Sequence, residues 1–115
     1  MIEVGEYVRT KQGEIAKIVD TNMFDKTIYK DIQGAKYYLE DIVNHSKNII
    51  DLIEVGDYVN GYRILEKTKI KNNEMQICIL KDNNCSNWRT VNDKTLKSIV
   101  TKEQFASMEY KVKEE

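Results

Sequence analysis

Proline is absent from this 115-residue chain, and histidine occurs once, at His45. The formal net charge is only −1. A single imidazole cannot supply the clustered ligands of a metal site or the paired groups of a catalytic triad, so we interpret His45 as a surface or turn-capping residue. A charge near zero gives no overall attraction to phosphate, although Lys and Arg can still gather on one face. The composition therefore disfavours both an enzyme and a nucleic-acid-binding protein.

Long apolar runs are also missing. The longest one, residues 49–53, is interrupted by Asp51 and falls far short of the ~18 residues of a membrane-spanning helix. The first residues lack the basic and apolar regions of a secretory signal. We predict a cytoplasmic protein without a membrane partner, in which Cys78 and Cys85 stay reduced. Cys78 is then an ordinary packing residue and Cys85 an incidental loop thiol.

What the chain does contain is a repeat. Residues 2–8 read IEVGEYV and residues 53–59 read IEVGDYV, so that Glu6 and Asp57 are the only difference. A weaker echo relates residues 41–47 to residues 98–104. Two copies of one small module, residues 1–52 and 53–115, are predicted to fill the chain. Modules of this size bury little apolar surface alone, so we expect them to pack against each other.

Short alternating runs between polar turns predict strands in both modules. A polar turn ends at Gly13, and Asn60-Gly61 is a strong hairpin signal because both residues tolerate positive φ. In residues 74–80 the apolar side chains alternate with a period of two, which is typical of a strand with one buried face. Strands spaced roughly 8–12 residues apart indicate a meander, a sandwich or a small barrel.

Helix is predicted at one place in each module. Thr101 and Gln104 fit a capping box that opens a short helix, whereas residues 44–48 allow a single turn at most. Each module is then expected to end in an extended segment, residues 49–53 and 108–112. Such a segment would close a five-stranded barrel and remove an open sheet edge.

The opening VGEYVRT, followed by GEIAKI at residues 13–18, resembles the first strands of SH3-like barrels. The resemblance implies a mostly β protein of two tandem, five-stranded, partly open SH3-like barrels, with one short helical turn each. The linking residues 41–46 read DIVNHS and the terminal residues 99–105 read IVTKEQF. With these two stretches in particular, most of residues 1–112 also resembles small accessory proteins of unassigned function encoded in phages and prophages of low-GC Gram-positive bacteria. Because such proteins often block host defence machinery, this second resemblance implies a host protein, such as a defence effector, as the partner.

Aromatic and basic side chains supply the candidate partner-binding surface, because Tyr and Trp give large contact area at a low entropic cost. Trp88 beside Arg89 is the best single anchor, unless Trp88 is the core plug of a small barrel. Three alternating lysines after residue 66 indicate either a solvated, protected sheet edge or a stripe that faces phosphate. The predicted set is Trp88, Arg89, Tyr62, Arg63, Tyr37, Tyr38, Lys67, Lys69 and Lys71.

No catalytic residue, cofactor or metal site is predicted, because the sequence has no phosphate loop, nucleophile elbow, dinucleotide fingerprint or paired-cysteine ligand set. We therefore predict a non-catalytic binding protein that inhibits or modulates a host factor by direct contact, as an anti-CRISPR inhibitor does. One alternative is a nucleic-acid-binding or transcription-associated module. Another is a sponge for a signalling nucleotide, which needs a pocket between modules or subunits lined by Arg or Lys and Tyr.

Overall fold

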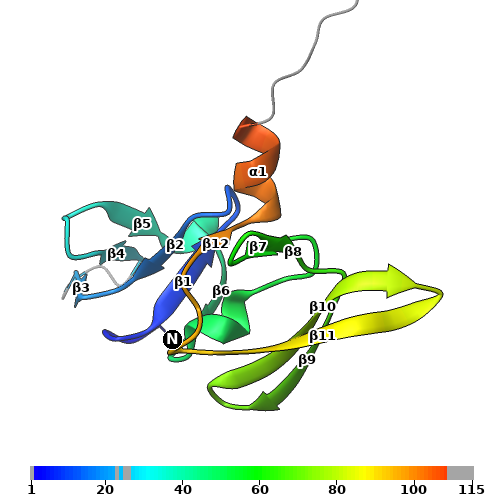
Figure 1. Cartoon of the computed structure of the whole chain (residues 1–115). Coiled ribbons are helices and arrows are strands. Elements are labelled where there is room, and N and C mark those ends of the chain that lie inside the picture. Colours follow the sequence, from blue (N-terminus) through cyan, green and yellow to red (C-terminus); the bar gives the residue numbers. More distant parts are fainter. Residues whose placement is uncertain (1, 23, 25–26, 109–115) are drawn as a thin grey trace, which may run out of the picture.

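The computed structural model describes residues 2–22, 24 and 27–108. It is mostly β, with 47% strand and 14% helix, as the sequence predicts. Within the described residues the strands form four three-stranded sheets, none of which closes on itself (Figure 1). Each half of the chain contributes two of these sheets.

The first half holds six strands and a 3₁₀ turn, at the left of Figure 1. The first strand is central in one sheet, between the second strand and the last, and the fourth strand is central in the other sheet. The turn η1 precedes the last strand. The elements are β1 (Tyr7–Thr10), β2 (Ile15–Lys17), β3 (Asp20–Thr21), β4 (Ile28–Lys30), β5 (Lys36–Tyr38), η1 (Leu39–Asp41) and β6 (Ile42–Ser46).

The second half repeats this order of pairing. Its first strand again lies between the second strand and the last, and its fourth strand is central in a longer, protruding sheet (Figure 1). A 3₁₀ turn precedes this half, and an α-helix follows it. The elements are η2 (Ile49–Leu52), β7 (Tyr58–Val59), β8 (Tyr62–Arg63), β9 (Glu66–Lys71), β10 (Glu74–Asp82), β11 (Asn84–Asn92), β12 (Ile99–Val100) and α1 (Lys102–Met108).

The repeated phrase folds in the same way twice. Gly5 and Gly56 adopt φ values of 96° and 97°, which favour glycine, and their N–H groups donate to Ile18 and Ile64 at 2.8 and 2.9 Å. In the first copy the Glu6 carboxylate accepts a hydrogen bond from the Glu3 N–H, and in the second the Asp57 carboxylate accepts one from the Glu54 N–H. The duplication seen in the sequence is therefore a duplication of local structure.

The weaker repeat, which relates residues 41–47 to residues 98–104, does not place its residues at equivalent positions in the sheets. Val8 and Val59 are equivalent in the phrase, and they face His45 and Ile99 respectively. The structural counterpart of Ile99 is thus His45, whereas the sequence echo aligned Ile99 with Ile42. The echo therefore did not predict which residues of the two last strands are equivalent.

Two apolar clusters of buried residues lie one in each half. The first consists of Ile2, Val8, Ala16, Ile18 and Tyr29, and the second of Ile50, Ile53, Val59, Ile64, Met75, Ile77 and Val91. Ile50 lies in η2, before the predicted module boundary at residue 52, yet its side chain belongs to the second cluster. The division into residues 1–52 and 53–115 stays a prediction.

Local sequence signals predicted the turns and the helix start. Asn60 and Gly61 have φ values of 51° and 86°, as a primed hairpin turn requires, and they join β7 to β8. Thr101 and Gln104 form the reciprocal capping box, with bonds of 3.2 and 3.3 Å between each backbone N–H and the other side chain. Both predictions are confirmed.

The predicted closing segments are not found as expected. Ile49–Leu52 forms the 3₁₀ turn η2 instead of an extended strand, with Ile50 and Leu52 buried and the Ile53 N–H donating to the Ile50 carbonyl. Met108 ends α1, and residues 109–112 lie outside the described residues. Barrel closure by these segments was therefore wrong for the first and is untested for the second.

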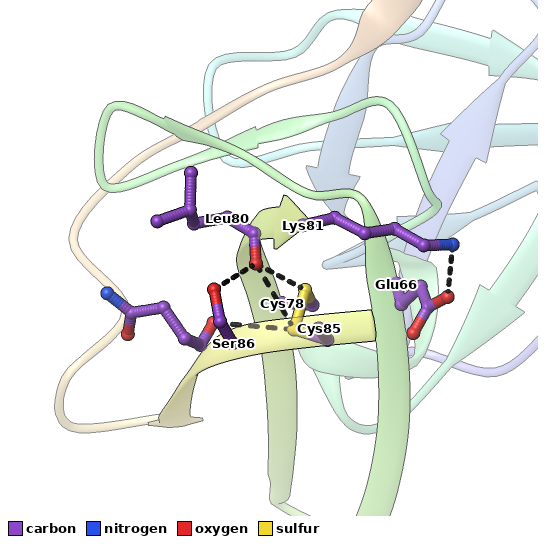
Figure 2. Close-up of a disulfide and its surroundings, with 7 residues drawn as sticks. Glu66, Cys78, Leu80, Lys81, Cys85 and Ser86 are labelled. Atoms are coloured by element: carbon purple, nitrogen blue, oxygen red, sulfur yellow. Dashed lines mark hydrogen bonds and ion pairs between the residues drawn. A yellow bond between two sulfur atoms is a disulfide. The ribbon is translucent and has the colours of Figure 1, made fainter. Parts of the chain in front are cut away.

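The two cysteines form a disulfide, contrary to the prediction of separate reduced thiols (Figure 2). Their Cα atoms are 5.9 Å apart, within the usual range for a bridge. The turn at Asn83 folds β11 back on β10, and irregular pairing around Leu80 brings Cys78 diagonally to Cys85. The prediction relied on compartment alone, whereas the hairpin geometry decides the pairing.

Candidate functional site

The predicted binding residues divide between the two halves. Tyr62 and Arg89 meet, with the guanidinium 5.1 Å from the ring centre, which is cation–π distance. Trp88 lies opposite Cys78 of the neighbouring strand β10. Its side chain is 41% exposed, so Trp88 does not fill the core of a barrel. Trp88 and Arg89 are adjacent in β11 and therefore point to opposite faces.

Two of the predicted lysines are held by the protein itself. Lys67 and Lys69 lie opposite Ile77 and Met75, both buried, so the lysines share the core-facing side of the sheet. The Lys67 ammonium donates to the Ile53 carbonyl, and Lys69 pairs with Asp51 at 2.7 Å. Charged side chains along an edge strand are one way in which proteins protect such an edge. Lys71, at the end of β9, is exposed, as are Lys67 and Lys69.

The predicted tyrosines of β5 have different roles. Tyr37 packs against the first apolar cluster, and its hydroxyl donates to the Asp31 carboxylate at 2.9 Å. Burial, then the hydrogen bond to Asp31 and the charge of that carboxylate, raise the pKa of Tyr37 to about 12. Tyr38 points the other way and is exposed. Tyr38 alone of the pair is thus available to a partner.

An apolar groove lies beside Tyr38 in the first half. It has a volume of about 450 Å³, and a neighbouring hollow of about 380 Å³ shares Thr27 and Leu39 with it. Its walls include Leu39 and Val43, which are 46% and 54% exposed. The lining residues are Ile2, Thr27, Tyr29, Leu39, Ile42, Val43, Asn44 and His45.

Local structure explains why these apolar side chains are exposed. The 3₁₀ turn η1 carries Leu39, whose N–H donates to the Thr27 carbonyl at 2.8 Å. In β6 the pairing with β1 passes from Ile42 to Asn44, so that Val43 is an extra, bulged residue. A bulge re-aims a side chain and often lies next to a functional site. Turn and bulge together open the groove.

A polar pair borders one end of the groove. His45 Nδ1 lies 3.0 Å from Glu6 Oε1. Burial alone would raise the pKa of Glu6, but bonds from His45 and from the Glu3 N–H outweigh it and lower that pKa. No third acid, cysteine or histidine joins this pair, and no group of three such side chains among the described residues is arranged to hold a metal. The pair places two polar side chains at this end of an otherwise apolar groove.

A buried arginine joins the halves. Arg9 of β1 is completely buried and donates to both carboxylate oxygens of Asp57, to the Leu52 carbonyl at 2.8 Å and to Glu103 at 2.7 Å. Its Nε lies 2.9 Å from a Glu54 oxygen, as an ion pair without hydrogen-bond geometry. We call this group the Arg9 cluster.

Hydrogen bonds keep the buried Asp57 carboxylate charged within the Arg9 cluster. Burial alone would raise the pKa of Asp57, but Arg9 and the N–H groups of Glu54 and Lys102 more than offset it, so that pKa is lowered. Lys102 adds a second cation, 3.1 Å from Glu54. A buried ion pair is tolerated when the arginine binds both carboxylate oxygens and the carboxylate also accepts hydrogen bonds from other groups, as Asp57 does here.

A hydrogen bond and an aromatic contact hold α1 beside the Arg9 cluster. The Thr101 hydroxyl, fully buried, donates to the Gly13 carbonyl at 2.8 Å. A Cβ at Gly13 would collide with Thr101, and its φ of 86° also favours glycine. Phe105 of α1 stacks on Tyr58 with the ring centres 4.4 Å apart. Helix, second half and first half therefore meet at one place.

A hollow of about 380 Å³ also lies between the halves. Tyr7 and Ile15 line it from the first half, and Asp93 and Lys97 are among its residues from the second. The nucleotide-sponge alternative needs such a pocket with Tyr and a cation. Here one lysine is accompanied by one aspartate, so the hollow lacks the surplus positive charge that a phosphate needs.

Comparisons with known proteins were made for the whole chain. No protein-family model, curated protein or solved structure matches it. In the part of the chain that the structure describes, no helix is both long and apolar enough to cross a membrane.

Sequence reasoning missed the groove and the Arg9 cluster. The sequence gives no sign that Leu39 and Val43 share a groove, since Val43 is turned outward only by a bulge, which leaves no sequence signal of its own. Arg9 did leave a signal. Directly after the repeated phrase the first copy has Arg9 and the second copy has Asn60. Within the phrase, the only difference is that Glu6 of the first copy is Asp57 in the second. These two differences between the copies fall on both partners of the buried ion pair.

Proposed function

We propose that this chain is a non-catalytic, phage-type binding protein that inhibits or modulates a host protein, such as a defence effector, by direct contact. The observation that carries the proposal is the open apolar groove beside Tyr38. Exposed apolar patches with polar rims mark interaction sites, and soluble proteins rarely keep them without a use. The groove holds Leu39 and Val43 on its walls and the pair of His45 and Glu6 at its rim.

The groove has the size and chemistry for one or two side chains of a partner. Its volume of about 450 Å³ falls within the range of roughly 300–1,000 Å³ of ligand sites. An apolar anchor such as Leu or Phe gains about 1.5–3 kcal/mol when it is buried. Asn44 and His45 at the lining offer hydrogen bonds that fix its orientation. The partner segment we propose is therefore apolar at its centre and polar at one end.

We further propose that each half is a partly open, SH3-like barrel. The support is the repeated order of pairing, in which the first strand of each half lies between the second and the last. The 3₁₀ turn η1 before β6 is a further supporting feature. The Arg9 cluster would then hold the two barrels in one orientation, so that a partner meets a rigid surface.

The nucleic-acid alternative loses its main support. It depended on the lysines of β9, and two of the three are bound to Asp51 and to the Ile53 carbonyl. Arg89 lies over Tyr62, so it too has a partner within the fold. No other described feature favours a phosphate backbone as the ligand, and we do not propose it.

A pair of matched variants tests the proposal. Val43 lies in the groove, and Val55 is comparably exposed in the repeated turn of the second half. We expect immobilised wild-type protein and the Val55→Glu variant to retain the same protein from a Gram-positive host lysate, and the Val43→Glu variant to lose it. Circular dichroism and melting curves would verify that all three are folded. Equal recovery on all three baits would refute the groove as the contact site.

A further inference from the structure

The long sheet of the second half has two outer strands of very different character. β9 and β11 flank β10, and in the part of the chain that the structure describes no other strand pairs with the outer edge of either. An unpaired edge is a template for another strand, and proteins protect it with charge, proline or short length. The two edges can therefore be compared directly.

β9 is protected and β11 is not. Four of the six residues of β9 are charged, and two of its lysines point inward. β11 has nine residues, no proline and no glycine, and Arg89 is its only charge. Asn84, Ser86, Trp88, Arg89 and Thr90 are exposed, and exposed residues alternate with less exposed ones only from Asn84 to Trp88. The pairing of β11 with β10 is irregular around Leu80 and regular from Trp88 to Asn92, and the outer edge of this regular part is open to a second strand.

β11 is also complementary to itself. Trp88 is the middle residue of Asn84–Asn92, so an antiparallel partner in full register would place Trp88 opposite the second Trp88. Arg89 would then face Asn87, and Ser86 would face Thr90. No two like charges oppose each other, and aromatic pairs directly opposite each other stabilise a sheet. A two-fold axis through Trp88 is the symmetry of the commonest homo-oligomer.

The disulfide adds a reason why the edge stays ordered. Cys85 of β11 is bonded to Cys78 of β10, and the Leu80 carbonyl faces the disulfide and the Ser86 hydroxyl (Figure 2). Lys81, beside the turn, is held by Glu66 at 2.8 Å. A hairpin fixed in this way presents its outer edge in one conformation. Less ordering entropy is then lost when a second strand pairs with it.

We propose that two copies of this chain associate through their β11 strands, antiparallel and about an axis at Trp88, to form one continuous six-stranded sheet. The partner is a second copy of the chain. This interface lies in the second half, away from the groove residues of the first half, and it does not depend on the proposed function. If both hold, the dimer presents two grooves.

The first test measures mass over a dilution series by light scattering or sedimentation. The chain has a mass of 13.5 kDa, and we expect twice this value, falling on dilution. Trp88→Lys places two like charges at the axis, and we expect dissociation to become roughly tenfold easier or more. Thr68→Lys is the matched control, since Thr68 and Thr90 lie opposite the same Gln76 on the two edges. The control should leave the dimer intact.

A second variant must act in the other direction. In Asn87→Glu, the new carboxylate of each copy would lie opposite Arg89 of the other copy, which gives two ion pairs per dimer. We expect a roughly 2- to 30-fold tighter dimer. Tightening cannot result from a misfolded variant. A monomer at every concentration overturns the proposal, as does a dimer that neither Trp88→Lys nor Asn87→Glu changes. A monomer whose capture of a host protein is lost in Trp88→Lys would mean that a foreign strand occupies this edge, which also overturns it.

Discussion

Replacing Arg9 by methionine tests how the two halves are joined. Methionine fills much of the same space without charge, so the change removes the hydrogen bonds and leaves most of the packing. Four hydrogen bonds are lost, one to Leu52, two to Asp57 and one to Glu103. Asp57 keeps only the N–H groups of Glu54 and Lys102 as donors. A fully buried carboxylate thereby loses its counter-ion.

The expected loss is large for a chain of this size. Breaking a buried ion pair by removing one partner costs about 3–5 kcal/mol, because the remaining charge stays desolvated. The free energy of unfolding of a small domain is about 5–15 kcal/mol, so Arg9→Met would remove a substantial fraction of it. Arg63→Met is the matched control, since Arg63 is exposed in β8. An exposed substitution changes stability by about 0.5 kcal/mol or less.

Urea titration measures both the loss and its location. Trp88, the single tryptophan, reports on the second half by fluorescence, whereas far-ultraviolet circular dichroism reports on both halves. In the wild type we expect the two transitions to coincide. In Arg9→Met we expect a lower midpoint and separated transitions, since each half keeps its own apolar cluster. A loss below about 1 kcal/mol relative to Arg63→Met would refute the reasoning.

Three further changes have expected outcomes. Because the pKa values of Asp57 and Asp51 are lowered in the folded state, their ionised carboxylates stabilise the folded protein above pH of about 4. This stabilisation disappears as the pH falls through the lowered values, which acid titration followed by circular dichroism would detect. Reduction of the Cys78–Cys85 disulfide, which closes a loop with a sequence separation of 7, should lower the free energy of unfolding by about 2.5 kcal/mol in urea titrations with and without reductant. Gly13→Ala should lower the melting temperature, because a Cβ there meets Thr101 and the backbone has positive φ.

Each of these outcomes has a control. Asp57→Asn should flatten the acid transition, and an unchanged profile would show that Asp57 is not the titrating group. Identical urea curves in the two redox conditions would mean that the hairpin does not need its bridge. Gly34→Ala is the comparison for Gly13, since Gly34 also has positive φ but no atom lies within 4 Å of its added Cβ. If both glycine variants melt alike, the contact with Thr101 contributes nothing beyond the backbone strain.

Local signals predicted part of this fold from sequence, and contacts distant in sequence decided the rest. The turn at Asn60 and the capping box at Thr101 depend on residues at most a few positions apart, so the sequence carries them openly. Arg9 and Asp57 are 48 residues apart, and no local pattern pairs them. Val43 became a groove residue only through a bulge in strand pairing, which binary patterning does not encode.

Hydrogen–deuterium exchange on the complex with the captured host protein tests the central claim most directly. The claim is that the groove of the first half is where a partner binds. It predicts slower exchange at Leu39–Asp41 and Ile42–Ser46 in the complex than in the free protein, with β2 (Ile15–Lys17), which does not line the groove, unchanged. Protection that appears elsewhere, with these two segments exchanging as before, would contradict it.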